Sequence, residues 1–257
     1  MVVLEIGRAT VGGVRLVIFD KDGTLIELYP YISQTVLLRA RRIGRALGLA
    51  PPEESGLVRA LGVDAAARRI RPEGPAGIRP REEVLAAAVG YLEAIGRPGA
   101  EAACREAFAA VDEISARDPG RFIRPLPGAV ALVRALRAQG CRVAVATQDL
   151  TARGRLALAA LGLEQEIDAL AGSDRVSRPK PHPEAIHLLL AELGIPAAQA
   201  VMVGDAPTDL EMARRAGLSA AVGVLGGITP EETLRSLTPY VVRDLTAIRV
   251  RPAGQGT

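Results

Sequence analysis

The sequence of 257 residues predicts an α/β fold, a doubly wound parallel sheet whose first core strand is followed by an inserted all-helical domain. Three observations lead to this prediction. An apolar run at residues 14–19 has the pattern of a buried strand and ends in two aspartates. From residue 125 onward, strand-like runs alternate with helical patterns, which is typical of parallel strands with right-handed crossovers. No strand pattern is visible between residues 28 and 122.

The N-terminal part begins with a short apolar strand at residues 2–6 and a turn at Gly12-Gly13, before the first core strand. The pattern then changes to apolar residues at helical spacing, with arginines on the other face. Helices are expected at 31–48, 53–61, 82–95 and 99–116. Prolines and glycines exclude regular structure from Arg71 to Arg81. The sequence therefore predicts an inserted helical domain at residues 26–124.

Strands and helices alternate again after the insert. Strands are expected at 142–146, 168–171, 200–203, 219–222 and 240–242. Helices are expected at 127–139, 151–162, 183–194, 207–216 and 230–236. The core domain is therefore predicted to comprise residues 1–25 and 125–257, with a frayed tail from Pro252.

The composition, with 49% hydrophobic and 24% charged residues, is that of an ordinary soluble globular protein. The chain lacks a run of about 18 uncharged apolar residues, so we expect no membrane span, and its start lacks a signal-peptide pattern. Cys104 and Cys141 form neither a disulfide framework nor a zinc site, which favours the cytoplasm. A net charge of +3 argues against a nucleic-acid partner. We expect a monomer or a homodimer.

Lysine is rare in this sequence. Only Lys21 and Lys180 are lysines, whereas the other 30 basic residues are arginines. Lysine carries a compact point charge on a flexible stem, and arginine carries a planar fork, so the two are not interchangeable. Both lysines are therefore candidate site residues, although chance survival on the surface is the alternative.

Two carboxylates, Asp20 and Asp22, directly follow the first core strand and lie one residue apart. Open α/β sheets bind their ligands at the carboxyl ends of the strands. From a tight loop, one carboxylate could attack a reacting group while the other donates and accepts a proton. The alternative is a simple turn, because Asp-Gly is a common turn dipeptide.

Polar side chains follow other predicted strands as well. Asp205 and Asp209, together with Asp20, offer the hard oxygen ligands that Mg²⁺ takes. The hydroxyl of Thr147 suits a phosphate oxygen, and Lys180, between two prolines, could neutralise phosphate charge. Each has an ordinary alternative: a helix-start acid for Asp209, a strand-end threonine and a solvated loop lysine.

The order of these motifs resembles that of the haloacid-dehalogenase-like hydrolase superfamily. The run Asp-Lys-Asp-Gly-Thr-Leu at 20–25 resembles its first motif, Thr147 its second, Lys180 its third, and Gly-Asp-Ala-Pro-Thr-Asp at 204–209 its fourth. The inserted domain resembles the alpha-helical cap of the phosphoglycolate-phosphatase-like branch. This resemblance implies a Rossmann-like core with a helical cap.

The resemblance also implies roles for individual residues. Asp20 would be the nucleophile that forms an aspartyl-phosphate, and Asp22 would protonate the leaving oxygen and then activate water. Thr147 and Lys180 would hold the phosphoryl group. The implied Mg²⁺ ligands are Asp20, the backbone carbonyl of Asp22, Asp205, and Asp209 either directly or through water.

Substrate contacts are predicted from the motif loops and from the insert. The candidates are Gly23, Thr147, Gln148, Lys180, Arg79 and Arg81. Gln148 stands where the family often has asparagine, which could alter the fit of the substrate. Arg79 and Arg81, in the Pro- and Gly-rich stretch, could grip an anionic substrate, but a solvated loop in an arginine-rich chain is an equally good explanation.

These residues lead to one main functional hypothesis and two alternatives. The main hypothesis is a Mg²⁺-dependent phosphatase of a small phosphorylated metabolite, such as phosphoglycolate or a sugar phosphate. An acid at Asp22 suits cleavage of an oxygen–phosphorus bond, whereas dehalogenases and phosphonate-cleaving members of the family lack it. The alternatives are a phosphomutase of the beta-phosphoglucomutase kind and, less favoured, a non-catalytic phosphate-binding module.

Overall fold

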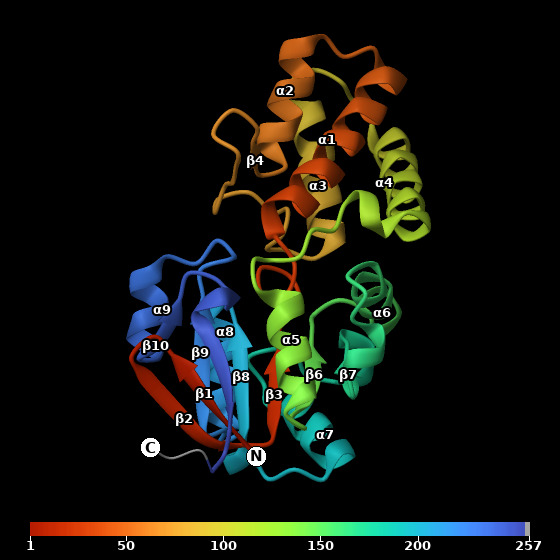
Figure 1. Ribbon diagram of the computed structural model, residues 1–257. Helices are drawn as coiled ribbons and strands as arrows, with labels where there is room; N and C mark the ends of the chain where they lie inside the picture. The colour runs from red at the N-terminus through yellow and green to blue at the C-terminus, as the bar shows by residue number, and fades with distance from the viewer. Residues whose placement is uncertain (255–257) are drawn as a thin grey trace. The chain divides into compact units, whose positions relative to one another are not determined.

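A computed structural model describes residues 1–254 of the chain. The chain divides into two compact units (Figure 1). The core unit combines Met1–Glu27 with the chain from Ile123 onward, and the helical unit is Leu28–Phe122. Among the described residues, no helix is both long enough and apolar enough to cross a membrane.

The core unit is built on a six-stranded sheet in which every neighbouring pair is parallel. The strands, in spatial order, are β10 (Tyr240–Val242), β9 (Ala220–Val224), β8 (Ala200–Gly204), β3 (Leu16–Phe19), β6 (Arg142–Ala146) and β7 (Ala169–Ala171). From the central β3 the chain adds β6 and β7 on one side, and then β8, β9 and β10 on the other. The strand order therefore reverses at β3, which is where doubly wound sheets bind ligands. The predicted fold class is confirmed.

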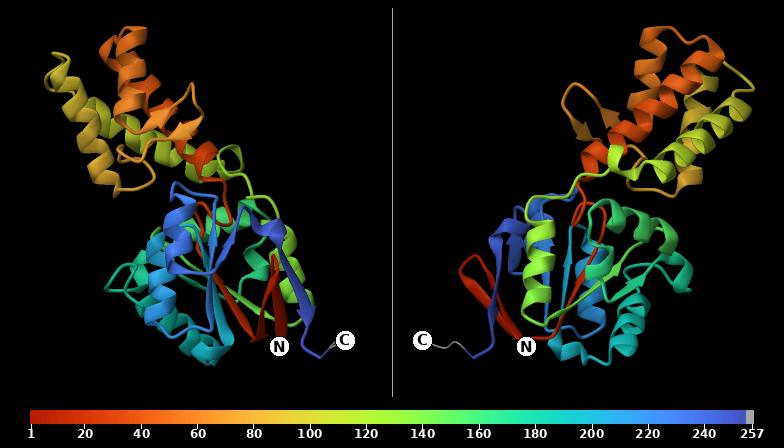
Figure 2. Two further views of the ribbon diagram at one scale, coloured as in Figure 1. Left: turned by 90° about the vertical axis from the view of Figure 1, so that its left-hand side faces the viewer. Right: turned by 45° about the vertical axis from the view of Figure 1, so that its right-hand side comes forward.

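The apolar run of β3 is explained by burial on both faces of the sheet. Val17 and Phe19 belong to one buried cluster, and Leu16 and Ile18 belong to another. The first cluster includes residues of α5 (Ala129–Ala138) and α6 (Thr151–Ala160), and the second includes residues of α7 (Glu184–Leu193) and α8 (Pro207–Arg215). Alternate side chains of a strand point to opposite faces, so helices cover both sides of the sheet (Figure 2). A further helix, α9 (Glu231–Leu237), precedes β10.

A second, antiparallel sheet in the core unit was only partly predicted. Its strands are β11 (Ile248–Pro252), β1 (Val2–Ile6) and β2 (Ala9–Val14), and only β1 was expected. Gly12 and Gly13 lie in β2 rather than in a turn, because pairing with β1 overrides their turn preference. Pro252 ends β11, and the N–H of Ala253 donates to the carbonyl of Met1 at 3.1 Å, so the start of the tail is paired. The rest of the predicted frayed tail, 255–257, lies outside the described residues.

The helical unit contains α1 (Leu28–Leu47), α2 (Pro51–Ala60), α3 (Arg81–Ala94) and α4 (Glu101–Arg117), packed around one buried apolar cluster. It is not entirely helical, which corrects the prediction of an all-helical insert. A short hairpin pairs β4 (Val63–Asp64) with β5 (Arg69–Ile70). Two residues per strand carry too little alternation to be recognised in a sequence.

Candidate active site

The predicted site residues of the core unit meet at the carboxyl edge of the parallel sheet. Asp20 directly follows β3, Thr147 follows β6, and Asp205 follows β8. The N–H of Asp20 donates to the carbonyl of Val203 at 2.9 Å, and the N–H of Thr147 donates to the carbonyl of Ala171 at 2.9 Å. The hydrogen bonding of the sheet therefore extends to Asp20 and Thr147 and fixes their backbones at this edge.

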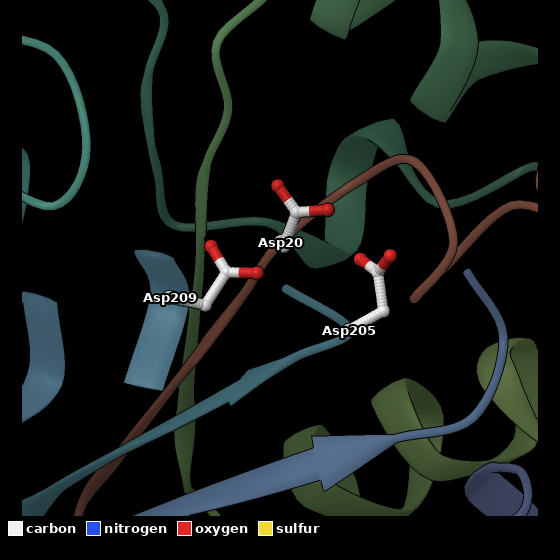
Figure 3. A group of neighbouring side chains, drawn as sticks. All are labelled: Asp20, Asp205 and Asp209. Atoms are coloured by element: carbon white, nitrogen blue, oxygen red, sulfur yellow. The ribbon is translucent and has the colours of Figure 1, made fainter. Parts of the chain in front are cut away.

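Three buried carboxylates, those of Asp20, Asp205 and Asp209, form the centre of the site. Each offers one oxygen, and these oxygens all lie within 4.8 Å of one another. Figure 3 shows the three carboxyl groups close together, with Asp209 contributed by the first turn of α8. Such a set of hard oxygen donors suits a divalent cation of the Mg²⁺ kind.

Negative charge at this centre is not fully compensated. Burial raises the pKa of Asp20 to about 6, and the charges of Asp209 and Asp22 add to the increase, although Lys180 lowers it. Burial, with the charges of Asp20 and Asp209, also raises the pKa of Asp205 well above its usual range. Because ionised carboxylates are unfavourable at this edge, a bound cation would relieve their repulsion. The donor set therefore fits a resident metal ion.

Lys180 lies between two of these carboxylates. Its Nζ is 2.6 Å from Oδ1 of Asp20 and 2.6 Å from Oδ1 of Asp209. Burial alone would lower the pKa of Lys180, but the two aspartates raise it above its usual value, so the side chain stays an ammonium. A fixed positive charge beside Asp20 can also attract an anionic phosphoryl group.

The loop that carries Lys180 is held by a residue that the sequence analysis did not identify. Glu184, at the start of α7, accepts the N–H of Ser177 at 2.7 Å and the N–H of Arg178 at 3.2 Å. The hydrogen bond from the N–H of Ser177 is the largest reason that the pKa of Glu184 falls to about 2. An acid in the first turn of a helix just after the lysine motif was the available signal.

The backbone of three glycines lies directly against the side chains of Asp205 and Asp209. A Cβ on Gly227 would lie 1.8 Å from Oδ2 of Asp205, and a Cβ on Gly23 would lie 2.5 Å from the same oxygen. A Cβ on Gly204 would lie 2.4 Å from the Cβ of Asp209. Gly227 was missed by the sequence analysis, although a glycine pair shortly after β9 marks a close approach of the backbone.

Thr147 and Asp22 complete the predicted catalytic set, and Gln148 follows Thr147 in the chain. The buried Thr147 accepts the N–H of Asp149 at its Oγ1, at 3.1 Å, and its O–H can donate to a ligand. The side chain of Asp22 is 31% exposed, and both of its oxygens are 2.6 Å from Nζ of Lys21. Gln148 is exposed.

Arg79 and Arg81 belong to the helical unit. Arg79 is exposed and lies 3.9 Å from Glu83. Arg81 donates from Nε to Oδ2 of Asp112 at 2.7 Å, and Arg39 donates to Oδ1 of the same aspartate at 2.7 Å. Arg81 therefore forms an ion pair inside its own unit, and a substrate contact for either arginine stays a prediction.

Comparisons with known proteins show what the chain is similar to. The model of the haloacid dehalogenase-like hydrolases matches residues 14–217. A protein of Dickeya dadantii described as "Probable phosphatase IndB" is 33% identical over 232 residues, which cover 89% of both chains. The phosphoglycolate phosphatase of Rhodospirillum rubrum is 32% identical over 211 residues, 81% of this chain and 78% of the relative.

A solved structure shows the same fold. The crystal structure of a haloacid dehalogenase superfamily hydrolase of subfamily IA from Geobacter sulfurreducens matches with a TM-score of 0.64. The match covers 91% of this chain and 94% of the other, at 21% sequence identity.

Proposed function

Since the chain belongs to the haloacid dehalogenase-like hydrolase family and is a phosphatase, we propose that it hydrolyses a small phosphorylated metabolite through an aspartyl-phosphate at Asp20. The predicted family and enzyme class are confirmed. The observation that carries the proposal is the buried group of Asp20, Asp205 and Asp209 with Lys180 between two of its members. Buried charged groups with shifted pKa values that gather at a ligand-binding edge are typical of functional sites.

The first half of the proposed reaction transfers the phosphoryl group to the protein. A carboxylate oxygen of Asp20 attacks phosphorus, and the ester P–O bond breaks. Asp22 donates its proton to the departing oxygen, which leaves as an alcohol. Lys180 and Thr147 hold the phosphoryl oxygens, so that the attacking and leaving oxygens stay in line.

The second half restores the enzyme. Asp22, now ionised, takes a proton from a water molecule, and the oxygen of that water attacks phosphorus. The bond between phosphorus and Asp20 breaks, and inorganic phosphate leaves. One carboxylate thus serves as acid and then as base, and the proton balance closes over the cycle.

We propose Mg²⁺ as the resident cation, held by Asp20, Asp205 and the backbone carbonyl of Asp22, with Asp209 in direct contact or through water. The ion supplies positive charge that lets a carboxylate approach a phosphate. Both oxygens of Asp209 already have partners, because Oδ1 accepts from Lys180 at 2.6 Å and Oδ2 accepts the N–H of Ala206 at 3.1 Å. Each oxygen keeps a second lone pair, so these hydrogen bonds are compatible with either contact.

For the substrate we propose phosphoglycolate or a sugar phosphate. The Rhodospirillum rubrum relative is a phosphoglycolate phosphatase, and it matches this chain over most of its length. Gly23 and Gln148 are the proposed contacts from the core unit. The helical unit is the proposed cap, with Arg79 and Arg81 as its candidate contacts to the anionic substrate. A cytoplasmic location and a monomer or homodimer remain predictions.

The test is phosphate release from a panel of phosphorylated metabolites, measured with Mg²⁺, with a chelator, and with the Asp20→Asn variant. We expect release that the chelator abolishes and that the variant reduces by on the order of 10⁴-fold or more, as for the loss of other covalent nucleophiles. The melting temperature of the variant shows whether it is folded.

Three results would contradict the proposal. Release that is unchanged in Asp20→Asn would exclude this nucleophile. No release by the folded wild type from any compound would favour a phosphate-binding module. Transfer of the phosphoryl group to a second position of a sugar, through a bisphosphate, would identify a phosphomutase.

A further inference from the structure

The second lysine of the chain contacts a different acid from the first. The side chain of Lys21 is 2% exposed, and its Nζ lies 2.6 Å from Oδ1 and 2.6 Å from Oδ2 of Asp22. Asp149 is a further neighbour, with its Oδ2 3.6 Å from the same nitrogen. The two lysines thus contact different acids of the site, since Lys180 contacts Asp20 and Asp209.

Lys21 also connects two loops of the site. Its backbone carbonyl accepts the N–H groups of Leu25 and Ile26, each at 3.0 Å, so the first loop is folded around this residue. Its ammonium reaches Asp149, whose N–H in turn donates to Oγ1 of Thr147 at 3.1 Å. The charge of Lys21 therefore joins the loop of Asp22 to the loop of Thr147.

The contact with both oxygens limits how Asp22 can move. The side chain of Asp22 is 31% exposed, so packing alone does not fix its carboxyl group. An ammonium donating to both oxygens defines the position and the plane of that group. A buried ion pair contributes little net stability, because desolvation offsets much of the attraction. Its presence here is better explained by placement of the acid than by folding energy.

The rarity of lysine supports the same explanation. With 30 arginines in the chain, arginine is the common basic residue, yet this buried position holds one of the two lysines. The compact ammonium of Lys21 is almost fully buried here, whereas a planar guanidinium with five N–H donors needs more room and more acceptors.

We propose that Lys21 is a positioning residue, which holds the carboxyl group of Asp22 where it can donate a proton to the leaving oxygen and later accept one from water. The inference rests on the proposed phosphatase reaction. Lys21 takes no part in the proton balance, because the transferred proton moves only between Asp22, the leaving oxygen and water. The ammonium keeps a hydrogen bond to Asp22 in either state.

The first test compares two leaving groups in the wild type, Lys21→Met and Asp22→Asn. The substrates are the preferred alkyl phosphate of the panel and p-nitrophenyl phosphate, whose leaving group needs little protonation. General acid–base catalysis is worth about 10²–10⁴-fold. For the alkyl phosphate we therefore expect Lys21→Met to lower kcat/KM by about 30-fold. For p-nitrophenyl phosphate we expect less than about threefold.

Matched variants separate placement from general damage. Asp22→Asn should show the same dependence on the leaving group with a larger amplitude. Lys21→Arg, which restores the charge, should recover part of the activity toward the alkyl phosphate. Asp149→Asn leaves the contact between Lys21 and Asp22 in place, and it should lower kcat/KM less than Lys21→Met does.

The second test detects the contact between Lys21 and Asp22 by NMR, without measuring activity. Because the chain has only two lysines, a sample with ¹⁵N at lysine Nζ has two side-chain ammonium signals, and Lys21→Arg identifies one of them. We expect Asp22→Asn to shift or broaden the Lys21 signal and to leave the Lys180 signal in place.

Equal losses of kcat/KM for both substrates in Lys21→Met, in a wild type that is active, would overturn this inference alone. An unchanged Lys21 signal in Asp22→Asn would also overturn it. A wild type that releases phosphate from neither compound would refute the proposed function, and this inference with it.

Discussion

The two ends of the parallel sheet bury acidic side chains in opposite ways. At the carboxyl end, burial and mutual repulsion raise the pKa values of Asp20 and Asp205. At the amino end, Asp168 is held by Arg137 and Arg142, each at 2.6 Å, and by the N–H of Val143 at 2.8 Å. Burial raises the pKa of Asp168 as well, but these donors lower it further, and the net pKa is below its usual value.

This difference separates stability from function within one sheet. The acid at the amino end has donors for its charge, so its ionised form stabilises the fold. The acids at the carboxyl end share one lysine and have a surplus of negative charge, which destabilises the protein until a cation is bound. Changes at the two ends should therefore have opposite effects on stability and on activity.

After the nucleophile variant Asp20→Asn, the largest effect is expected for Asp205→Asn. The change removes a proposed metal ligand, and it should lower phosphate release by on the order of 10³-fold. Because the pKa of Asp205 is raised, its ionised form costs stability at neutral pH, and the variant should melt at a higher temperature than the wild type without metal. Calorimetry beside the phosphate assay checks both effects. A lower melting temperature would contradict the comparison.

Gly227→Ala should displace the carboxylate of Asp205 without removing it. The added Cβ would lie 1.8 Å from Oδ2 of Asp205, so the carboxylate must move. A displacement of about 1 Å at a catalytic site can cost about 10²-fold, and we expect a loss of this size in kcat/KM. Gly12→Ala is the matched control, because nothing lies within 4 Å of its Cβ. Similar losses in both variants would contradict the account.

Asp168→Asn should have the opposite profile, with a loss of stability and unchanged phosphate release. Hydrogen bonds to a charged group contribute about 1.5–3 kcal/mol, so the free energy of unfolding should fall by about 2 kcal/mol at pH 7. A lowered pKa in the folded state means that this stabilisation is present above the unfolded-state pKa and is lost as the pH falls through the folded-state value. Urea unfolding at several pH values measures it.

The free energies of unfolding of the wild type and of Asp168→Asn, plotted against pH, should converge in acid. A difference that stays constant down to pH values where every carboxyl group is protonated would show that Asp168 contributes through packing rather than through charge. Lost phosphate release in the folded variant would show that the two ends of the sheet are coupled.

The smallest effect is expected at an exposed ion pair of α9. Arg235 and Glu231 lie 2.6 Å apart, with side chains 54% and 48% exposed. Such pairs contribute about 0.3–0.5 kcal/mol, so Glu231→Gln should hardly change the free energy of unfolding. This variant calibrates Asp168→Asn, because it removes a similar charge without burial. An equal loss of unfolding free energy in Glu231→Gln and Asp168→Asn would contradict the difference between a buried and an exposed acid.

Much of the site follows from the sequence because a parallel sheet brings the carboxyl ends of its strands to one edge. Asp20, Thr147 and Asp205 could therefore be grouped although they are far apart in the chain. Glu184 and Gly227 act through contacts with loops whose conformation the sequence does not display. Strand β2 was missed because Gly12 and Gly13 favour a turn, and only pairing with β1 makes them part of a strand.

The most direct test of the account is a rapid-quench experiment with a ³²P-labelled phosphate ester and Mg²⁺. The account predicts label on the wild-type protein within the first turnover, released by hydroxylamine as expected for an acyl phosphate, and absent from Asp20→Asn. Rapid release of phosphate without labelled protein at any time, or label that persists in Asp20→Asn, would contradict an aspartyl-phosphate at Asp20.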